Sequence, residues 1–268
     1  MIAIDLGGTN LRTALVKNNK IIKIIKEKTP KNKSAIIRLI NSSIKILMNK
    51  DVIGIGVGSP GPLKNGKILN TLNIDLRNFD LKSHLKKKFK VKVEVENDAK
   101  CVALAELHLS TKKKNFFILT LGTGIGGGVI IDGKLFNKED IGSELGYIYL
   151  DKNNSFEDLA SSKAVNKLTK KYLGKQMILT NAMKIKNSKR VIDEITDRLA
   201  QGIGSLINIF NPEIVVLSGG FTKAGLTFLN LIRKKSRKYI LLPKKYNIIY
   251  SKLKEPGILG ASLLLKIG

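Results

Sequence analysis

The chain alternates between segments with the apolar periodicity of strands and segments with the periodicity of helices. Its most informative strand pattern runs from Phe116 to Phe136, where an apolar stretch, a glycine-rich bend and a second apolar stretch follow one another. Asp132-Gly133 then supplies the residue pair that a tight hairpin turn favours. Met1–Val16 repeats this design as strand, Gly-Gly-Thr-Asn turn and strand. The pattern therefore predicts two hairpins with glycine-rich turns.

Helical periodicity accounts for much of the remaining chain. Ser34 is expected to cap a helix whose apolar positions are Ile36, Ile37, Ile40, Ile44 and Leu47. Further helices are predicted over Leu81–Phe89 and from the Asn97-Asp98 corner to Leu109. Later in the chain, one helix ends at about Leu173, one spans about Ser188–Phe210 and one ends at Lys238. The last helix begins at Pro256. Strands are predicted between them at Val52–Val57, Val91–Val95, Ile214–Ser218 and Tyr246–Tyr250. This alternation is typical of an α/β protein.

The two glycine-rich turns also carry candidate chemistry. Because glycine has no side chain, a group approaching either turn meets backbone N–H groups, with the hydroxyl of Thr9 or Thr123 beside them. Two such turns are what binding one polyphosphate from opposite sides requires. Asp5 offers a carboxylate for a hydrated Mg²⁺. Taken alone, the longer bend is equally consistent with a flexible or bulged hairpin turn.

Three motifs together resemble those of the ROK family, which comprises sugar kinases and transcriptional repressors. They are Asp5-Leu-Gly-Gly-Thr, Asn97-Asp98-Ala99 and Leu121-Gly-Thr-Gly-Ile-Gly-Gly-Gly, and the resemblance covers nearly the whole chain. It implies the two-lobed actin-like ATPase (ribonuclease H-like) α/β fold, with the active site in the cleft between the lobes. We expect residues 1–112 plus 255–268 to form the N-terminal lobe and 113–254 the C-terminal lobe.

The resemblance also assigns expected roles to individual positions. It implies that a nucleotide and its phosphates meet Asp5, Gly7, Gly8, Thr9, Asn10, Arg12, Thr123, Gly124, Gly126, Gly219 and Gly220. It implies that the sugar meets Gly61, Asn73, Asn97, Asp98, Glu144, Tyr147 and Glu157. Without it, the Gly58–Pro62 loop and Asn73 would be interpreted as ordinary turns, and Gly219-Gly220 equally well as a strand-to-helix turn.

Asp98 is the expected catalytic residue. In the structural interpretation, Asp98 is the N-cap of the helix that follows. Its functional interpretation is a general base that accepts the proton of an attacking sugar hydroxyl during phosphoryl transfer. The matching motif favours the second role, and the two roles are compatible.

The segment Gly142-Ser143-Glu144-Leu145-Gly146-Tyr147 departs from the family pattern. Glu144 matches, but Tyr147 stands where the family has a sugar-binding His that also helps to bind a structural zinc. The cysteine cluster that completes that zinc site is missing here, and His84 and His108 match no functional position. We therefore expect no zinc, and a changed sugar pocket in which the Tyr147 phenol replaces one hydrogen bond.

Composition limits the classes of protein that fit. The 268 residues suffice for one large or two modest domains, and their apolar share of 43% argues against disorder. There is no apolar run of membrane-spanning length, and Met1 leads directly into a strand, so we expect neither a membrane span nor a signal peptide. The single cysteine, Cys101, excludes an internal disulfide and fits the cytoplasm.

The net charge of +27 raises the question of a polyanionic partner. Only seven of the 48 basic residues are Arg, and aromatic residues are not interleaved with the lysines as base-stacking platforms would require. Nucleic acid is therefore not expected as a partner. A lysine-rich surface without a partner is the favoured interpretation, and polyphosphate is the alternative.

The predicted function is an ATP- and Mg²⁺-dependent hexose kinase of the glucokinase type, acting as a cytoplasmic homodimer. The alternatives are a polyphosphate-dependent glucokinase and a non-catalytic sugar- or nucleotide-binding protein. A repressor of this family would need a DNA-binding extension before Asp5, so a repressor is not expected from this sequence.

Overall fold

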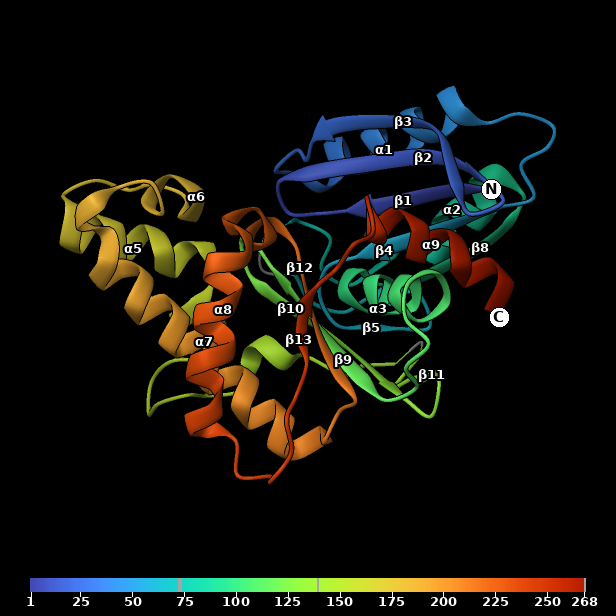
Figure 1. The fold of residues 1–268 in the computed structure, drawn as a ribbon. Helices are drawn as coiled ribbons and strands as arrows, with labels where there is room; N and C mark the ends of the chain where they lie inside the picture. The colour runs from blue at the N-terminus through green and yellow to red at the C-terminus, as the bar shows by residue number, and fades with distance from the viewer. Residues whose placement is uncertain (72–73, 139, 268) are drawn as a thin grey trace. The chain divides into compact units, whose positions relative to one another are not determined.

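The computed structural model describes residues 1–71, 74–138 and 140–267, which form two compact units (Figure 1). Unit 1 comprises Met1–Lys112, Leu135–Ser143 and Leu253–Gly268, and unit 2 comprises Lys113–Lys134 and Glu144–Lys252. Sequence analysis assigned residues 135–143 to the second lobe, whereas in the structure they cluster with unit 1. The chain therefore leaves unit 2 after Lys134 and returns to it at Glu144.

Unit 1 is built on a five-stranded sheet with the order β3-β2-β1-β4-β8. The first hairpin supplies β1 and β2, and β3 pairs antiparallel with β2. Strands β4 and β8 continue the sheet parallel to β1. The strands are β1 (Ile2–Leu6), β2 (Asn10–Lys17), β3 (Lys20–Lys28), β4 (Gly54–Ser59) and β8 (Lys92–Asn97). A small second sheet contains β5 (Leu63–Lys64), β6 (Lys67–Ile68) and β7 (Phe79–Asp80).

Strand β4, which lies between β1 and β8, explains how helices cover both faces of this sheet. Its sequence Gly-Ile-Gly-Val-Gly places Ile55 and Val57 in a core shared with α1 (Lys33–Leu47) and α2 (Leu81–Phe89). The glycines point to the opposite face, which α3 (Asp98–Leu109) and α9 (Pro256–Ile267) cover. A Cβ on Gly56 would lie 1.9 Å from the carbonyl oxygen of Ala261 in α9, so only glycine allows this packing.

Two local predictions in unit 1 need correction. Asn32, rather than Ser34, caps α1, because its side chain accepts a hydrogen bond from the Ala35 N–H at 2.9 Å. The strand predicted at Val52–Val57 is Gly54–Ser59 in the structure. Three glycines in six residues weaken a propensity-based prediction, and pairing with β1 and β8 determines the observed bounds.

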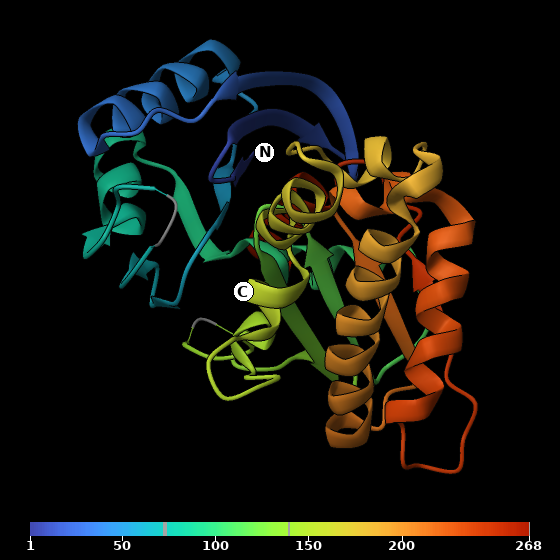
Figure 2. The ribbon, with the colours of Figure 1, turned by 90° about the vertical axis from the view of Figure 1, so that its left-hand side faces the viewer.

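Unit 2 repeats the plan with the strand order β11-β10-β9-β12-β13. Its strands are β9 (Phe116–Leu121), β10 (Ile125–Ile131), β11 (Lys134–Leu135), β12 (Ile214–Ser218) and β13 (Ile248–Tyr250). Its helices are α4 (Phe156–Ala160), α5 (Ser162–Leu173), α6 (Leu179–Ala182), α7 (Lys189–Phe210) and α8 (Gly225–Ser236). The long α7 packs against α4, α5 and α8, and Figure 2 shows α7 and α8 side by side.

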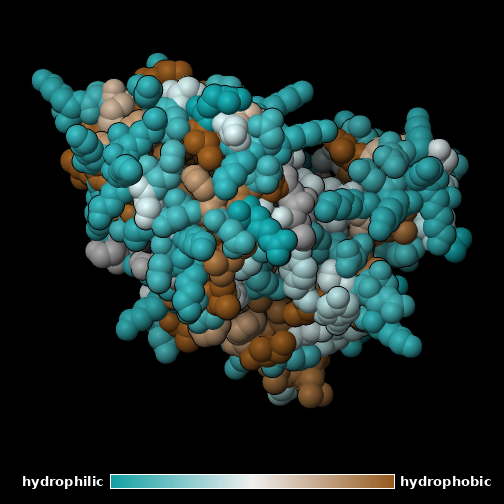
Figure 3. Space-filling view, turned by 180° about the vertical axis from the view of Figure 1, so that it is seen from behind, coloured by the Kyte–Doolittle hydropathy of each residue, from teal (hydrophilic) through white to brown (hydrophobic). Residues whose placement is uncertain are grey.

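The surface reflects the lysine-rich composition. Hydrophilic side chains cover most of the face seen in Figure 3, with hydrophobic atoms gathered in smaller patches. In the described part of the chain, no helix has the length and apolar character that crossing a membrane requires.

Candidate functional site

Several predicted residues of unit 1 meet at one edge of its sheet. Strands β1, β4 and β8 are parallel, so their carboxyl ends lie at the same edge, which is the usual position of ligands in such sheets. The pairing of Asp5 with Gly58 and of Ser59 with Asn97 sets the relative heights of the three strand ends. The turn after β1, the Gly61 loop after β4 and the Asn97-Asp98 corner after β8 therefore share this edge.

Hydrogen bonds fix the shape of the turn between β1 and β2, and three of its residues are exposed. The Gly7 N–H donates to the Asn10 carbonyl at 3.0 Å. Thr29 adds two bonds, because its hydroxyl donates to the Gly7 carbonyl at 2.6 Å and its N–H donates to the Thr9 carbonyl at 3.0 Å. Gly8, Thr9 and Asn10 are exposed, so this turn presents a preorganised backbone to a ligand.

Asp5 lies beneath that turn in contact with Arg12. The Arg12 guanidinium donates to Asp5 Oδ2 at 2.7 Å, and the Asp5 side chain is only 15% exposed. Burial raises the pKa of Asp5, and the Arg12 charge offsets only part of that rise. A single carboxylate with one oxygen already bound to Arg12 fits a Mg²⁺ ion that keeps its waters better than one enclosed by protein ligands.

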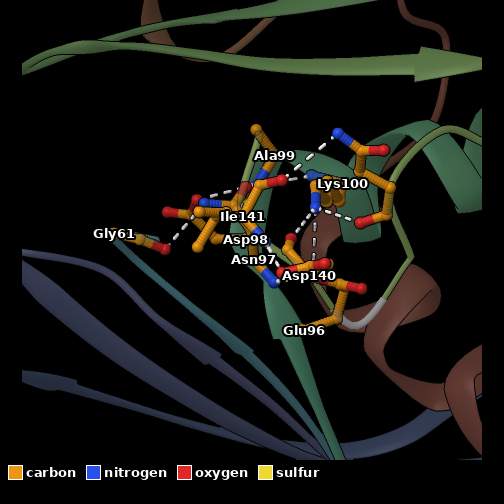
Figure 4. A network of polar contacts seen from close by, with 9 residues as sticks. Gly61, Glu96, Asn97, Asp98, Ala99, Lys100, Asp140 and Ile141 are labelled. Carbon is orange, nitrogen blue, oxygen red and sulfur yellow. Dashed lines mark hydrogen bonds and ion pairs between the residues drawn. The ribbon is translucent and has the colours of Figure 1, made fainter. Parts of the chain in front are cut away.

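The Asn97-Asp98 corner begins α3 (Figure 4). Asn97, rather than Asp98, is the N-cap, because its Oδ1 accepts from the N–H groups of Ala99 at 2.9 Å and Lys100 at 3.2 Å. Asn97 Nδ2 donates to the Gly61 carbonyl at 3.2 Å, which joins two predicted sugar-site positions. Asp98 is half-buried in the first helical turn, and its Oδ1 accepts from the Ala99 N–H at 2.8 Å.

The glycine-rich bend of unit 2 joins β9 to β10 and contacts the second predicted nucleotide loop. The Ser162 N–H at the start of α5 donates to the Gly122 carbonyl at 2.9 Å. Gly219 has a φ of 88°, and a Cβ there would lie 2.5 Å from the Leu121 carbonyl oxygen. The loop after β12 can therefore lie directly beside the bend only with glycine at that position. Thr123, Gly219 and Gly220 are exposed.

Three predicted sugar-binding residues of unit 2 gather around the same bend. Glu157 Oε2 accepts from the Ile125 N–H at 2.7 Å, next to Gly124. The Tyr147 N–H donates to the Glu144 carbonyl at 3.0 Å. Partial burial, together with the charges of Glu157 and Glu144, raises the pKa of Tyr147. The phenol therefore stays protonated at neutral pH and retains a hydrogen-bond donor.

The structure leaves some predictions untested and adds residues that sequence reasoning missed. Asn73 lies outside the described residues, so its predicted role stays a prediction. Thr29 and Lys100 support the turn and the corner, but neither belongs to a recognisable motif. Their partners lie 22 and 37 to 40 residues away, so no local signal identifies them.

Other polar clusters lie apart from the predicted residues. A cavity of about 460 Å³ in unit 2 is lined by Arg190, Asp193, Glu194, Asp197, Lys235 and Lys238. Four of these six charged residues form ion pairs, since Lys235 contacts Asp193 and Lys238 contacts Asp197, both at 2.5 Å. Among the described residues, no group of three or more His, Cys, Asp or Glu side chains is arranged to hold a metal ion.

Comparisons with known proteins agree with this architecture. A family model described as the ROK family matches residues 1–267. The chain is 32% identical to a glucokinase from Thermotoga maritima, with 99% of this chain and 97% of that protein covered. It is 27% identical to a xylose repressor from Caldicellulosiruptor bescii, with 100% and 78% covered. The structure of a ROK hexokinase from Thermus thermophilus superposes with a TM-score of 0.84 at 25% identity, covering 100% and 99%. The predicted fold class is thereby confirmed.

Proposed function

The chain belongs to the ROK family, and from this we propose that it is an ATP-dependent hexose kinase that transfers a phosphoryl group to a sugar hydroxyl. The observation that carries the proposal is the position of Asp98. Asp98 is the first residue of α3, which starts at the edge of the sheet where the parallel strands β1, β4 and β8 end. Beside it, the Asn97 side chain is hydrogen-bonded to the Gly61 carbonyl. The similarity to a glucokinase over nearly the full length of both chains supports the same reaction.

In the proposed mechanism Asp98 is the general base. It accepts the proton of the attacking sugar hydroxyl as the phosphoryl group transfers, which raises the nucleophilicity of that oxygen. The sugar is positioned by Gly61, Asn73, Asn97, Glu144, Tyr147 and Glu157. The phosphates meet backbone N–H groups and hydroxyls of the two glycine-rich turns, at Gly7, Gly8, Thr9, Asn10, Thr123, Gly124 and Gly126, with Arg12 nearby. Gly219 and Gly220 border the nucleoside.

Asp5 is the proposed protein ligand for Mg²⁺, held through water. When bound, the ion offsets negative charge on the phosphate oxygens. Arg12 donates to Asp5 Oδ2 at 2.7 Å and thereby restricts the orientation of the carboxylate. The structure offers no further acidic cluster for a metal among the residues it describes.

The donor is proposed to be ATP, and inorganic polyphosphate is the second candidate. The observation that favours polyphosphate is the net charge of +27, because a long polyanion gains from many lysines at once. Polyphosphate-dependent turnover should fall steeply with added salt, whereas ATP-dependent turnover should respond weakly.

A coupled phosphorylation assay tests the proposal directly. Purified protein with Mg²⁺ and no added zinc is offered glucose, mannose, fructose, N-acetylglucosamine and N-acetylmannosamine, each with ATP and with polyphosphate. Turnover on one sugar identifies the acceptor and the donor together. If folded protein is silent across the panel but is stabilised against heat by a sugar, the non-catalytic binding role replaces the kinase. Tyr147→His is then the first variant to assay.

Asp98→Asn tests the assigned base. We expect kcat to fall by about 10²- to 10⁴-fold, the range for a lost general base, while the fold survives because Asn97 provides the cap. Asp80→Asn is the matched control, since Asp80 caps α2 in the same unit and its Oδ1 accepts from the Ser83 N–H. Near-wild-type turnover in Asp98→Asn would reject Asp98 as the base.

We also propose that the protein works as a cytoplasmic homodimer, as the family resemblance implies. Light scattering after size-exclusion chromatography measures the molar mass in solution. A mass of about one chain at micromolar concentration would refute the dimer.

A further inference from the structure

Lys100 differs from the other lysines of this lysine-rich chain in being buried. Its side chain is 2% exposed, and among the described residues no other lysine is buried to this degree. An ammonium group inside a protein is costly unless charged or polar partners surround it closely. The residues that surround this one therefore indicate why it is there.

Among the described residues, three oxygen atoms lie around the Lys100 ammonium (Figure 4). It donates to the carbonyl of Asn137 at 2.5 Å and to the carbonyl of Asp140 at 2.7 Å. Glu96 Oε1 lies 3.7 Å away, and that side chain is also 2% exposed. Two of the three oxygens belong to the backbone of one loop, so Lys100 binds the loop itself rather than a particular side chain.

That loop lies within Leu135–Ser143, the segment that clusters with unit 1 and connects two segments of unit 2. It folds back on itself, because the Asn137 side chain donates to the Ile141 carbonyl at 3.2 Å and the Ile141 N–H donates to Asp140 Oδ1 at 2.8 Å. The described part of this turn thus points two carbonyls at one ammonium. Three residues beyond Ile141 the chain reaches Glu144, a proposed sugar ligand.

Lys100 is also connected to the proposed base, through Glu96 and Asn97. Glu96 Oε1, its ion-pair partner, accepts from the Asn97 N–H at 2.8 Å. Asn97 in turn caps α3 through the N–H groups of Ala99 and Lys100 and donates to the Gly61 carbonyl. The 137–141 loop, the Asn97-Asp98 corner and the Gly61 loop are therefore joined through one buried cation.

We propose that Lys100 is a positioning residue for the acceptor side of the reaction, and this proposal rests on the proposed kinase function. Its ammonium holds the described residues of the 137–141 loop, through the carbonyls of Asn137 and Asp140, against the start of α3. It thereby sets the geometry of Asn97 and Asp98 together with that of the chain leading into Glu144. The three contacts of the Lys100 ammonium involve neither glycine-rich turn, so binding of the phosphate donor should not depend on them.

Lys100→Met tests the proposal, since it keeps most of the side-chain volume and removes the ammonium. We expect the KM for the sugar to rise and kcat to fall, each by about tenfold, because small misplacements of reacting groups have effects of at least this size. The KM for the donor should stay at the wild-type value. A merely structural role would lower the folded fraction and leave both KM values unchanged.

Lys82→Met is the matched control. Lys82 forms an ion pair with Glu94 at 2.7 Å in the same unit, and neither residue belongs to the proposed site. This variant loses the same charge and should keep wild-type kinetics. Equal effects of Lys82→Met and Lys100→Met on the sugar KM would overturn the proposal.

Hydrogen exchange provides a readout that does not need activity. In Lys100→Met, the backbone amides of residues 135–138 and 140–143 should exchange at least tenfold faster than in the wild type, whereas those of β9 should not change. This measurement also separates the two hypotheses. If the wild type phosphorylates no sugar, the kinase proposal fails, yet faster exchange in this segment still establishes the anchor.

The double variant Glu96→Gln with Lys100→Met separates positioning from stability. It removes the buried negative charge of Glu96, which loses its ion-pair partner Lys100 in the single variant, so it should fold even where Lys100→Met alone is unstable. The introduced amide retains an oxygen for the Asn97 N–H, but the loop carbonyls still lack their donor. We expect thermal stability to recover while loop exchange stays fast. Wild-type exchange in residues 135–138 and 140–143 of the double variant would overturn the proposal.

Discussion

The Glu157 carboxylate accepts a 2.7 Å hydrogen bond from the backbone N–H of Ile125, the first residue of β10. A Cβ on Gly124 would lie 2.3 Å from the same carboxylate oxygen, so the carboxylate lies directly against the glycine-rich bend. Glu157 is a proposed sugar ligand, and the bend is a proposed phosphate site. Under the proposed function, one side chain would therefore contribute to both the sugar site and the phosphate site.

Glu157→Ala should consequently raise the KM values of sugar and donor together. A hydrogen bond to a charged group contributes about 1.5–3 kcal/mol, which corresponds to about a 10- to 150-fold effect. Glu194→Ala is the control, because Glu194 Oε2 accepts from the Tyr172 hydroxyl in the same unit, remote from the bend. Steady-state kinetics with each substrate varied in turn provides the measurement. A change confined to the sugar KM would show that the Ile125 contact does not shape the bend.

Thr29→Val should weaken donor binding and spare the sugar. Val matches the shape of Thr and keeps the backbone N–H bond to the Thr9 carbonyl, but it loses the hydroxyl bond to Gly7. With about 1 kcal/mol for one such bond, the KM for the donor should rise about fivefold. Thr196→Val serves as the control, since that hydroxyl bonds to the Ile192 carbonyl inside α7. An unchanged donor KM would show that the turn keeps its shape without Thr29.

Gly260→Ala should destabilise unit 1. A Cβ at this position would lie 1.7 Å from the Cys101 carbonyl oxygen, so α9 would have to move away from α3. Overpacking of this kind costs about 1–3 kcal/mol of unfolding free energy, measurable by urea denaturation. Gly122→Ala is the comparison, because an added Cβ there meets nothing within 4 Å. Equal stability of the two variants would contradict the packing argument.

The capping box of α4 should make part of the stability depend on pH. Hydrogen bonds from the Ser155 hydroxyl and N–H lower the pKa of Asp158. The folded state therefore favours the charged carboxylate. The stability that it contributes is present above the ordinary Asp pKa of about 3.9 and is lost as the pH falls through the lower folded-state value.

Asp158→Asn should accordingly be less stable than the wild type by about 0.5 kcal/mol at pH 7, a small value because the group is exposed and screened by solvent. The difference should shrink toward zero near pH 3. Urea denaturation of both proteins at several pH values measures it. Asp51→Asn, at an exposed loop residue, controls for the change in net charge. A difference that stays constant between pH 7 and pH 3 would exclude the carboxylate as its source.

Local patterns in the sequence predicted the elements that bear the site. The hairpins around Gly7-Gly8 and around Gly122–Gly128 form as expected, because alternating apolar residues specify strands and glycines specify the bends between them. The Asn97-Asp98 corner begins a helix as predicted, although Asn97 is the cap. Both residues are good caps, and the choice depends on backbone geometry that composition does not reveal.

The sequence by itself thus determined the α/β class, the two glycine-rich turns and the position of Asp98 at a strand-to-helix junction, since all of these arise from interactions between near neighbours in the chain. Only the tertiary structure decided that residues 135–143 cluster with unit 1, that Glu157 bonds to the glycine-rich bend and that Lys100 is buried. In the sequence Lys100 resembles every other lysine. Its burial depends on carbonyls 37 and 40 residues away, and only the folded chain brings them to the ammonium.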